Sequence, residues 1–197
     1  MTTRYLTEAE LKAYVRSEIV TDNNLYVAAI NSAEVWLDSK MSRKVVLASV
    51  ETPAANARVF IPSGSQVMFI HDCTTITSVV DNGTTLVSGT DYQPEPLNLL
   101  SDMGEARPYY RLRRLNGYWY SSINKATISV TATWGWAAIP PMVKEACKIV
   151  AKEYFQQRDV AHGLIGITDV GGVGTRENQL VQDTVRAYQH PNSIGIG

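Results

Sequence analysis

The sequence has too little of several features to support whole classes of protein. Two cysteines, Cys73 and Cys147, stand far apart among 197 residues, which excludes a disulfide framework and a CxxC metal clip and fits a reducing compartment. No apolar run approaches the ~18 residues of a membrane span. Residues 1–12 lack an apolar stretch, so we expect no signal peptide and a protein made in a cytoplasm.

Charge of one sign is missing as well. Eighteen Lys and Arg oppose nineteen Asp and Glu, which gives a formal net charge of −1, and the balance holds in each third of the chain. A basic arm and an acidic tail are therefore excluded, and we do not expect diffuse electrostatic binding of DNA. An apolar content of 45% is ordinary for a globular protein and excludes wholesale disorder.

Recognisable catalytic motifs are also absent. The sequence has no HExxH, GxSxG or Walker A pattern, and His71, His162 and His190 have no metal-ligand spacing. The glycines of 171–174 follow no predicted strand and precede no P-loop lysine, so we interpret them as a flexible or assembly-ordered loop. We therefore expect a protein that is not an enzyme and that has no cofactor and no metal centre.

Two amphipathic helices are predicted in the first part of the chain. Thr7 and Glu10 form a T-x-x-E capping box, in which each side chain satisfies a backbone N–H at the start of a short helix. The polar cluster 21–24 ends that helix and begins the second one. Along the second helix, apolar residues recur at three- and four-residue steps: Tyr26, Ala29, Ile30, Ala33, Trp36, Leu37 and Met41.

From residue 45 to 134 the period changes to two, which predicts an inserted antiparallel β-rich unit without helices. Asn82-Gly83 and Asn116-Gly117 predict hairpin turns, because both central residues of a type I′ turn take positive φ. The proline-containing stretch 93–108 predicts an irregular loop, and 126–134 predicts the longest strand. The other predicted strands are 58–61, 67–71, 74–80, 84–87, 109–115 and 118–120.

The clearest predicted helix begins at Pro140-Pro141, since proline suits the first turn. Its apolar stripe consists of Val143, Ala146, Cys147, Val150, Ala151, Tyr154 and Phe155. A glycine-rich stretch over 163–174, a weaker helix over 176–188 and an extended tail over 191–197 follow. These patterns predict an α+β fold, a small helical bundle with an inserted antiparallel β-rich unit and an extended C-terminal tail. The predicted segments are the bundle helices 1–44, the insertion 45–134, the third bundle helix 135–160 and the assembly region 161–197.

Two features of the sequence indicate interaction surfaces. Arginines and aromatics interleave over 107–120, a composition shared by protein interfaces, nucleic-acid-binding surfaces and ordinary strand pairs with solvated arginines. The stretch 163–173 is too apolar for a plain linker and too rich in glycine for a core helix, so it predicts a segment that orders against a partner. The candidate hairpin interface is Arg107, Tyr109, Arg111, Arg113, Arg114, Tyr118, Trp119 and Tyr120. The candidate assembly interface is Gly163, Leu164, Ile165, Ile167, Val170, Val173, Tyr188, Ile194 and Ile196.

Several motifs resemble those of the head–tail connector proteins of long-tailed bacteriophages, also called adaptor or head-completion proteins. These motifs are Y-L-T-x-A-E-L-K over 5–12, V-T-A-T-W-G-W-A-A-I-P-P-M-V-K-E-A over 130–146, and F-x-x-R-D over 155–159 with the glycine-rich loop after it. Residues 51–125 match only as a general β insertion. The second motif places a candidate structural junction at Trp134, Gly135, Trp136 and Pro140.

The resemblance implies a non-enzymatic virion protein of the neck, where head and tail meet. Copies of such proteins form a homo-oligomeric ring, usually a dodecamer, beneath the portal protein. The ring extends the DNA channel for genome packaging and ejection, without sequence-specific contact to DNA, and presents a platform for a stopper or tail-completion protein. The C-terminal region would reach the portal or a neighbouring copy. Two alternatives stay open, namely a nucleic-acid-binding module that uses 107–120 and another neck protein such as a stopper.

Overall fold

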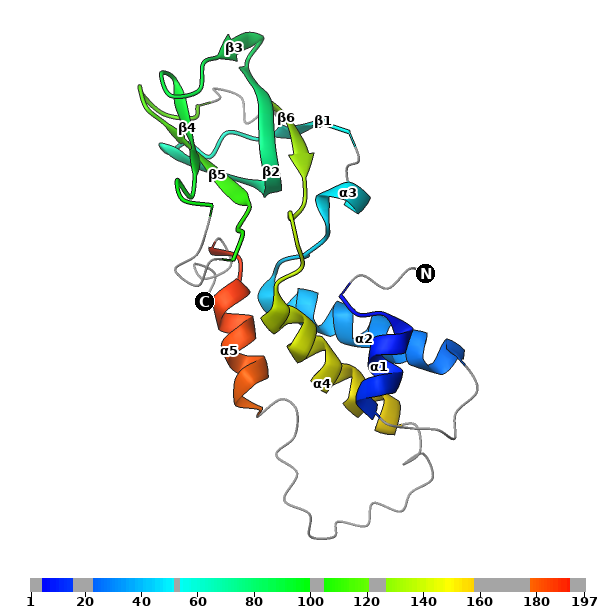
Figure 1. Cartoon of the computed structure of the whole chain (residues 1–197). Coiled ribbons are helices and arrows are strands. Elements are labelled where there is room, and N and C mark those ends of the chain that lie inside the picture. Colours follow the sequence, from blue (N-terminus) through cyan, green and yellow to red (C-terminus); the bar gives the residue numbers. More distant parts are fainter. Residues whose placement is uncertain are drawn as a thin grey trace. The chain divides into compact units, whose positions relative to one another are not determined.

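The computed structural model describes residues 5–15, 23–51, 54–99, 105–120, 127–157 and 178–191. The chain divides into two compact units, one formed by Met1–Lys44 with Ile139–Gly197 and the other by Val45–Ala138. The first unit is helical and the second holds an antiparallel sheet (Figure 1), so the predicted α+β class is confirmed. The finer division of the sequence into four segments stays a prediction.

The first unit contains α1 (Glu8–Val15), α2 (Asn23–Met41), α4 (Pro141–Gln157) and α5 (Gln179–Tyr188). The predicted capping box is present at α1, where the Thr7 N–H donates to Glu10 Oε2 at 2.7 Å and the Glu10 N–H donates to Thr7 Oγ1 at 3.2 Å. The α5 helix begins later than predicted, because the Asn178 side chain caps it by accepting from the Leu180 N–H at 3.0 Å. None of the described helices is long and apolar enough to cross a bilayer.

The core of this unit lies where α2 and α4 pack together. The Tyr26 and Phe155 rings stack with their centroids 4.5 Å apart. Two residues of the predicted stripes, Trp36 and Tyr154, are only half-buried and lie at the rim. Glu34, which no apolar pattern selects, is buried and accepts from the Tyr5 N–H at 2.8 Å. The buried residues of the two helices are Tyr26, Ala29, Ile30, Ala33, Leu37, Met41, Val143, Ala146, Cys147, Val150, Ala151 and Phe155.

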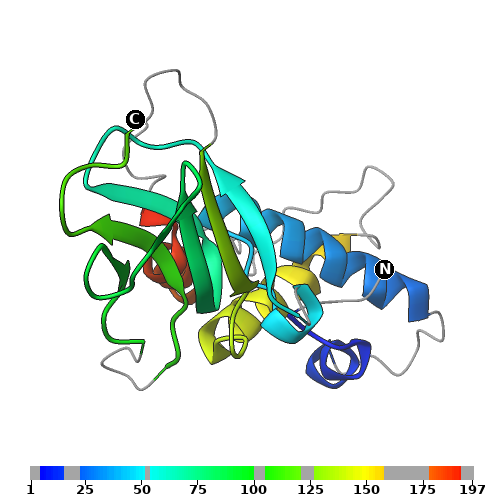
Figure 2. The same ribbon diagram turned by 90° about the horizontal axis from the view of Figure 1, so that it is seen from above.

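The second unit is a six-stranded antiparallel sheet in the described residues. Its strands are β1 (Asn56–Phe60), β2 (Val67–Asp81), β3 (Thr84–Leu86), β4 (Tyr92–Glu95), β5 (Tyr109–Arg114) and β6 (Ile128–Trp134). They lie in the order β1-β6-β2-β5-β4, with β3 paired to the end of β2, and Figure 2 looks onto these strands. A one-turn helix, α3 (Ala48–Glu51), precedes β1 in a region where no helix was predicted.

The sheet buries one face around a cluster that includes Trp119, Trp134, Leu112 and Val130, all fully buried. The predicted turn at Asn82-Gly83 is present, with φ of +47° and +85°, and joins β2 to β3. Both residues therefore take the positive φ that a type I′ turn requires.

The longest strand is β2 and not 126–134 as predicted. Two predicted strands, 67–71 and 74–80, are one continuous element of 15 residues. Register shifts near Cys73 and between Ile76 and Ser78 interrupt its pairing with β5 and β6. Such bulges insert a residue without ending the strand, so the two predicted runs belong to one strand with irregular pairing.

Two further predictions in this unit are wrong. The stretch 93–108 is not wholly irregular, because its first residues belong to β4, where Pro94 is tolerated in a strand at the edge of the sheet. No strand forms at 118–120, so there is no hairpin at Asn116-Gly117. The Trp119 N–H instead donates to Ser65 O, and Trp119 O accepts from the Gly64 N–H, both at 2.9 Å. The partner of this segment is therefore a distant turn and not the preceding strand.

We expect Ala151→Asp to unfold the helical unit, because the Ala151 side chain is fully buried in α4. An unpaired charge at such a position costs on the order of 3–5 kcal/mol. Thermal melts followed by circular dichroism would measure the loss. Gln156→Asp, which places the same charge at an exposed position of α4, is the control and should melt close to wild type. A soluble Ala151→Asp chain with a cooperative, unchanged melt would contradict the packing described for α4.

Candidate interaction surfaces

The titratable groups of the described residues do not gather into a reactive site. No group of three or more His, Cys, Asp or Glu side chains in these residues could hold a metal ion. Burial raises the pKa of the Cys73 thiol to about 12, so this cysteine stays protonated at neutral pH and is a poor nucleophile. His71 lies on β2, where its Nδ1 is 3.0 Å from the Arg58 guanidinium, and His162 lies outside the described residues.

A shared carboxylate holds two of the arginines predicted to form a binding surface. Glu95 on β4 faces Arg111 on β5 in the strand register. Its Oε2 lies 2.6 Å from Arg111 Nε, and its Oε1 accepts from Arg113 Nε, also at 2.6 Å. The Glu95 side chain is only 10% exposed, so both cations meet a largely desolvated anion. This triad joins an edge strand to its neighbour.

The two arginines lower the pKa of Glu95. Burial alone would raise the pKa of the carboxyl, but the hydrogen bond from Arg113 and the charges of Arg111 and Arg113 outweigh it and hold the pKa below its usual value of 4.5. The hydrogen bond that Arg113 donates to the same carboxylate raises the pKa of Arg113. The triad is thus fully charged at neutral pH.

The remaining residues of the predicted hairpin interface divide between core and surface. Trp119 was predicted to belong to the interface but is a core residue. Its side chain is completely buried, and its Nε1–H donates to Leu112 O at 3.1 Å. Arg114 lies over the Trp119 ring, 5.2 Å from its centroid, and 3.8 Å from the Asp81 carboxylate. Tyr118 and Tyr120 are exposed, as is Arg107, while Tyr109 packs against the sheet core. These residues therefore do not form one arginine–aromatic surface, which removes the main argument for a nucleic-acid-binding module.

The candidate junction contains a position that only glycine fits. Gly135 has φ of +109°, and a Cβ there would lie 2.7 Å from Val46 O and 2.9 Å from the Ala48 backbone. The backbone on both sides is held in place. The Trp136 N–H donates to Val46 O at 2.7 Å, and Trp136 O accepts from the Ala48 N–H at 2.8 Å. The beginning and the end of the inserted unit therefore lie side by side.

Trp134 and Trp136, on either side of this glycine, are each held by burial and by a hydrogen bond from the indole N–H. Trp134 and Trp136 are almost completely buried. The Trp134 Nε1–H donates to Asn56 O at 3.0 Å, and the Trp136 Nε1–H donates to Asp72 Oδ2 at 2.8 Å. Pro140, the fourth candidate residue, falls in the helical unit, where its carbonyl accepts from the Lys144 N–H at 3.2 Å at the start of α4. The motif thus contains the point at which the chain passes from one unit to the other.

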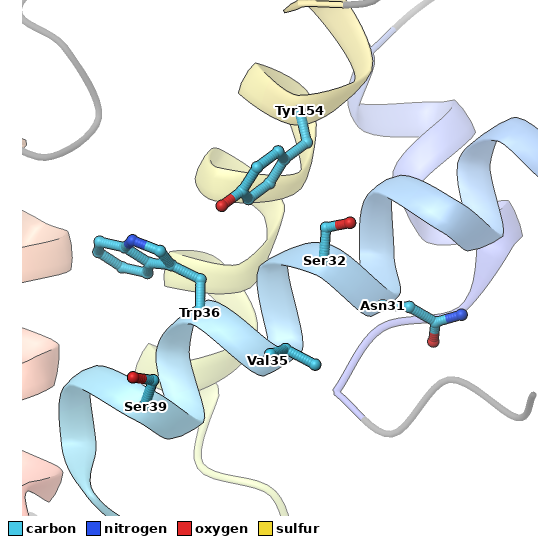
Figure 3. A pocket seen from close by; sticks show the side chains of 6 residues that line it. All are labelled: Asn31, Ser32, Val35, Trp36, Ser39 and Tyr154. Atoms are coloured by element: carbon cyan, nitrogen blue, oxygen red, sulfur yellow. The ribbon is translucent and has the colours of Figure 1, made fainter.

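The helical unit has a shallow groove that the sequence analysis did not identify. One part is lined by Asn31, Ser32, Val35, Trp36 and Ser39 of α2 with Tyr154 of α4. Figure 3 shows the Tyr154 ring reaching from α4 toward the Trp36 indole, with Ser32 on the α2 surface beside them. The other part continues from Trp36 and Lys40 to four residues of α5, Val181, Gln182, Val185 and Arg186. The sequence signal for this groove was the aromatic residue at the edge of each apolar stripe, Trp36 in α2 and Tyr154 in α4, because a residue at the edge of a stripe is partly exposed.

Most of the predicted C-terminal interface cannot be placed. Gly163, Leu164, Ile165, Ile167, Val170, Val173, Ile194 and Ile196 lie outside the described residues. Tyr188 is described and is 3% exposed, so its side chain belongs to the core of the helical unit. Its predicted place in the interface is therefore wrong. Its neighbour His190 donates its backbone N–H to Met41 O at 2.9 Å, which fixes the end of α5 against the end of α2.

Comparison with known proteins gives a likeness of fold. No protein-family model matches the chain, and no curated protein matches its sequence. A chain in a structure described as "Virion of native gene transfer agent (GTA) particle" is 16% identical, with a TM-score of 0.52 over 91% of this chain and 88% of that chain. A chain in "Neck of empty GTA particle computed with C6 symmetry" is 14% identical, with a TM-score of 0.55 over 96% of this chain and 92% of that chain. The likeness covers both units of the fold.

We expect Gly135→Ala to lower the free energy of unfolding by more than the roughly 1–3 kcal/mol of a strained backbone conformation alone, because the new Cβ would also overlap the Val46 carbonyl. Gly64→Ala is a matched control, since Gly64 has φ of +72° but open space around its missing Cβ. Urea denaturation of both variants measures the difference. Equal losses in the two variants would contradict the close approach at Gly135.

We expect Glu95→Gln to remove roughly 1–3 kcal/mol of stability at pH 7, because it leaves two guanidinium groups without their shared anion. Since the pKa of Glu95 is lowered on folding, its contribution is complete above the usual value of 4.5 and disappears as the pH falls through the lowered value. The difference between wild type and variant in urea titrations should therefore shrink in acid. Glu8→Gln, which breaks only the exposed pair with Lys12, is the control. A gap that stays constant from pH 7 to strong acid would argue against the triad.

Proposed function

We propose that this chain is a non-enzymatic structural protein of the neck of a phage-like particle. In this proposal, copies of the chain form a ring beneath the portal protein, which joins the DNA-filled head to the tail and extends the DNA channel. The ring binds the portal on one side and a stopper or tail-completion protein on the other. DNA passes through it without sequence-specific contact, and the protein is made in the host cytoplasm and works in the virion.

One observation carries the proposal. The fold matches a chain in the neck of a gene transfer agent particle over 96% of this chain and 92% of that chain. A likeness that extended over a single common helix pair or a single sheet would support little. The likeness instead extends over both the helical unit and the inserted sheet unit, and this extent supports a related structural role by analogy of fold.

The motifs of the sequence support the finer assignment. The W-G-W segment, which resembles the connector proteins, coincides with the constrained crossing at Gly135, so the likeness rests on a position with a physical requirement. A closed ring needs two different complementary surfaces on each copy and no bias of net charge. The formal net charge of −1 agrees with this requirement and with a channel that must not hold DNA tightly.

A stopper remains the second reading of the same fold, because both are neck proteins and the likeness does not specify a layer. The nucleic-acid-binding module is not carried forward. Two of the arginines on which it depends are paired with Glu95, and the central aromatic, Trp119, is buried.

Removing the gene from the particle that encodes it tests the proposal. We expect DNA-filled heads without attached tails, visible by negative-stain electron microscopy, with full recovery when the wild-type chain is supplied in trans. Cryo-electron microscopy of the recovered particle should show the chain in the layer that contacts the portal. If the density for the chain lies one layer further from the portal, the chain is a stopper and not an adaptor. Normal tailed particles without the chain would overturn the proposed function.

A further inference from the structure

The groove on the helical unit, which we call the α2 groove, combines apolar side chains with open cations. It consists of the pocket-lining residues of α2, α4 and α5 named above, with Trp36 shared by its two parts. Val35 is 67% exposed, and Trp36, Tyr154 and Val185 are half-buried, so a substantial apolar area faces solvent (Figure 3). Apolar surface of this kind, rimmed by polar groups, is typical of a protein docking site.

The charges along the α2 groove have one sign. Lys40 and Arg186 are both exposed at its α5 end, and Lys40 Nζ lies 5.9 Å from the centroid of the Trp36 ring. None of the described lining residues carries a carboxylate. Two acids on the same helices have other partners, since Asp183 accepts from the Gln179 side chain at 2.8 Å and Asp38 accepts from the Tyr5 hydroxyl. A fitting partner is therefore an apolar segment with a single negative charge.

The chain contains a segment with this chemistry. Residues 163–173 have the sequence G-L-I-G-I-T-D-V-G-G-V, in which Asp169 is the only charged residue. The residues beside it are small or aliphatic, and frequent glycines let a backbone approach a shallow surface closely. The segment belongs to the connection between α4 and α5, which contribute to the α2 groove together with α2 itself.

We propose that the α2 groove of one copy binds residues 163–173 of a neighbouring copy, with Asp169 placed between Lys40 and Arg186. The inference rests on the proposed ring and names the surfaces that would close it. A heterologous interface repeats one patch against a different patch, and a groove and a segment on every copy meet that condition. The apolar side chains of the segment and Trp36 supply the buried area, while the charges fix the register.

Charge reversal across the interface gives a direct test with the full chain. In the first variant, Asp169→Lys, the segment should repel its neighbour's groove. In the second, Lys40→Glu with Arg186→Glu, the groove should repel the segment. We expect each variant alone to self-associate at least about tenfold more weakly than wild type in sedimentation equilibrium. An equimolar mixture of the two should recover association, because every contact then joins opposite charges in alternating copies.

The mixture separates contact between copies from contact within one copy. Binding within a copy would leave the mixture no better than either variant alone, and that result overturns the proposal. Association of either variant at wild-type strength overturns it too, as does a wild-type chain that stays monomeric up to about 1 mM. Lys12→Glu with Lys144→Glu, a double reversal on α1 and α4 outside the groove, is the control, and circular dichroism confirms that all variants fold.

The outcome is independent of the particle experiment. If the gene is needed for joining tails to heads but the reversals leave self-association unchanged, the neck function stands and only the groove assignment fails. If the chain is dispensable for the particle but the paired reversals behave as expected, the interface is real and the proposed function fails.

Discussion

The backbone pairing between residues 46–48 and 135–136 is the constraint on which the two-unit architecture depends. Leu47 and Trp136 form an isolated parallel bridge, flanked by the hydrogen bonds of Trp136 to Val46 and Ala48. The Gly135 N–H adds a bond to Asp72 O at 2.7 Å, which ties the same point to β2. Because the inserted unit begins and ends at adjacent points, the segments before and after it are able to fold together as one helical unit. The close approach leaves no room for a side chain, so the architecture requires glycine at this position.

The two units use their charged and aromatic residues in opposite ways. In the sheet unit, Arg111 and Arg113 pair with Glu95 across β4 and β5, and Trp119 fills the core. A composition that is typical of a binding surface thus serves to hold an edge strand. In the helical unit, Trp36 and Lys40 come from an ordinary core-forming helix but face solvent in a groove. Composition alone therefore does not locate the exposed side chains, because exposure and pairing determine what an arginine or a tryptophan is free to contact.

The proposed ring of the neck requires firm binding between neighbouring copies and weak binding of the passing DNA. The balanced charge of the chain suits the second demand, since phosphate binding grows with the number of free cations that meet the backbone. Sequestering arginines against Glu95 acts in the same direction. Apolar contact guided by a few local charges, as proposed for the α2 groove, suits the first demand, because burial of apolar area requires no net charge on the chain.

Elements whose signals are local could be predicted from the amino-acid sequence. The capping box at Thr7 and Glu10, the positive-φ turn at Asn82-Gly83 and the apolar stripes of α2 and α4 depend on residues within a few positions of one another, so periodicity and turn chemistry were sufficient to predict them. The α+β class and the inserted β unit follow from the same local periods.

Features that depend on contacts between residues far apart in the sequence became apparent only in the folded chain. The continuity of β2, the inclusion of Pro94 in an edge strand and the burial of Trp119 are set by which strands or turns lie opposite, and pairing partners are not encoded in a local period. The role of the arginines was decided by Glu95, a residue separated from them by a loop. The groove around Trp36 is formed by residues of three helices, so the sequence of any one helix does not show that Trp36 lines a groove. Function at a surface is thus the least predictable part, because a surface is defined by what the rest of the chain leaves uncovered.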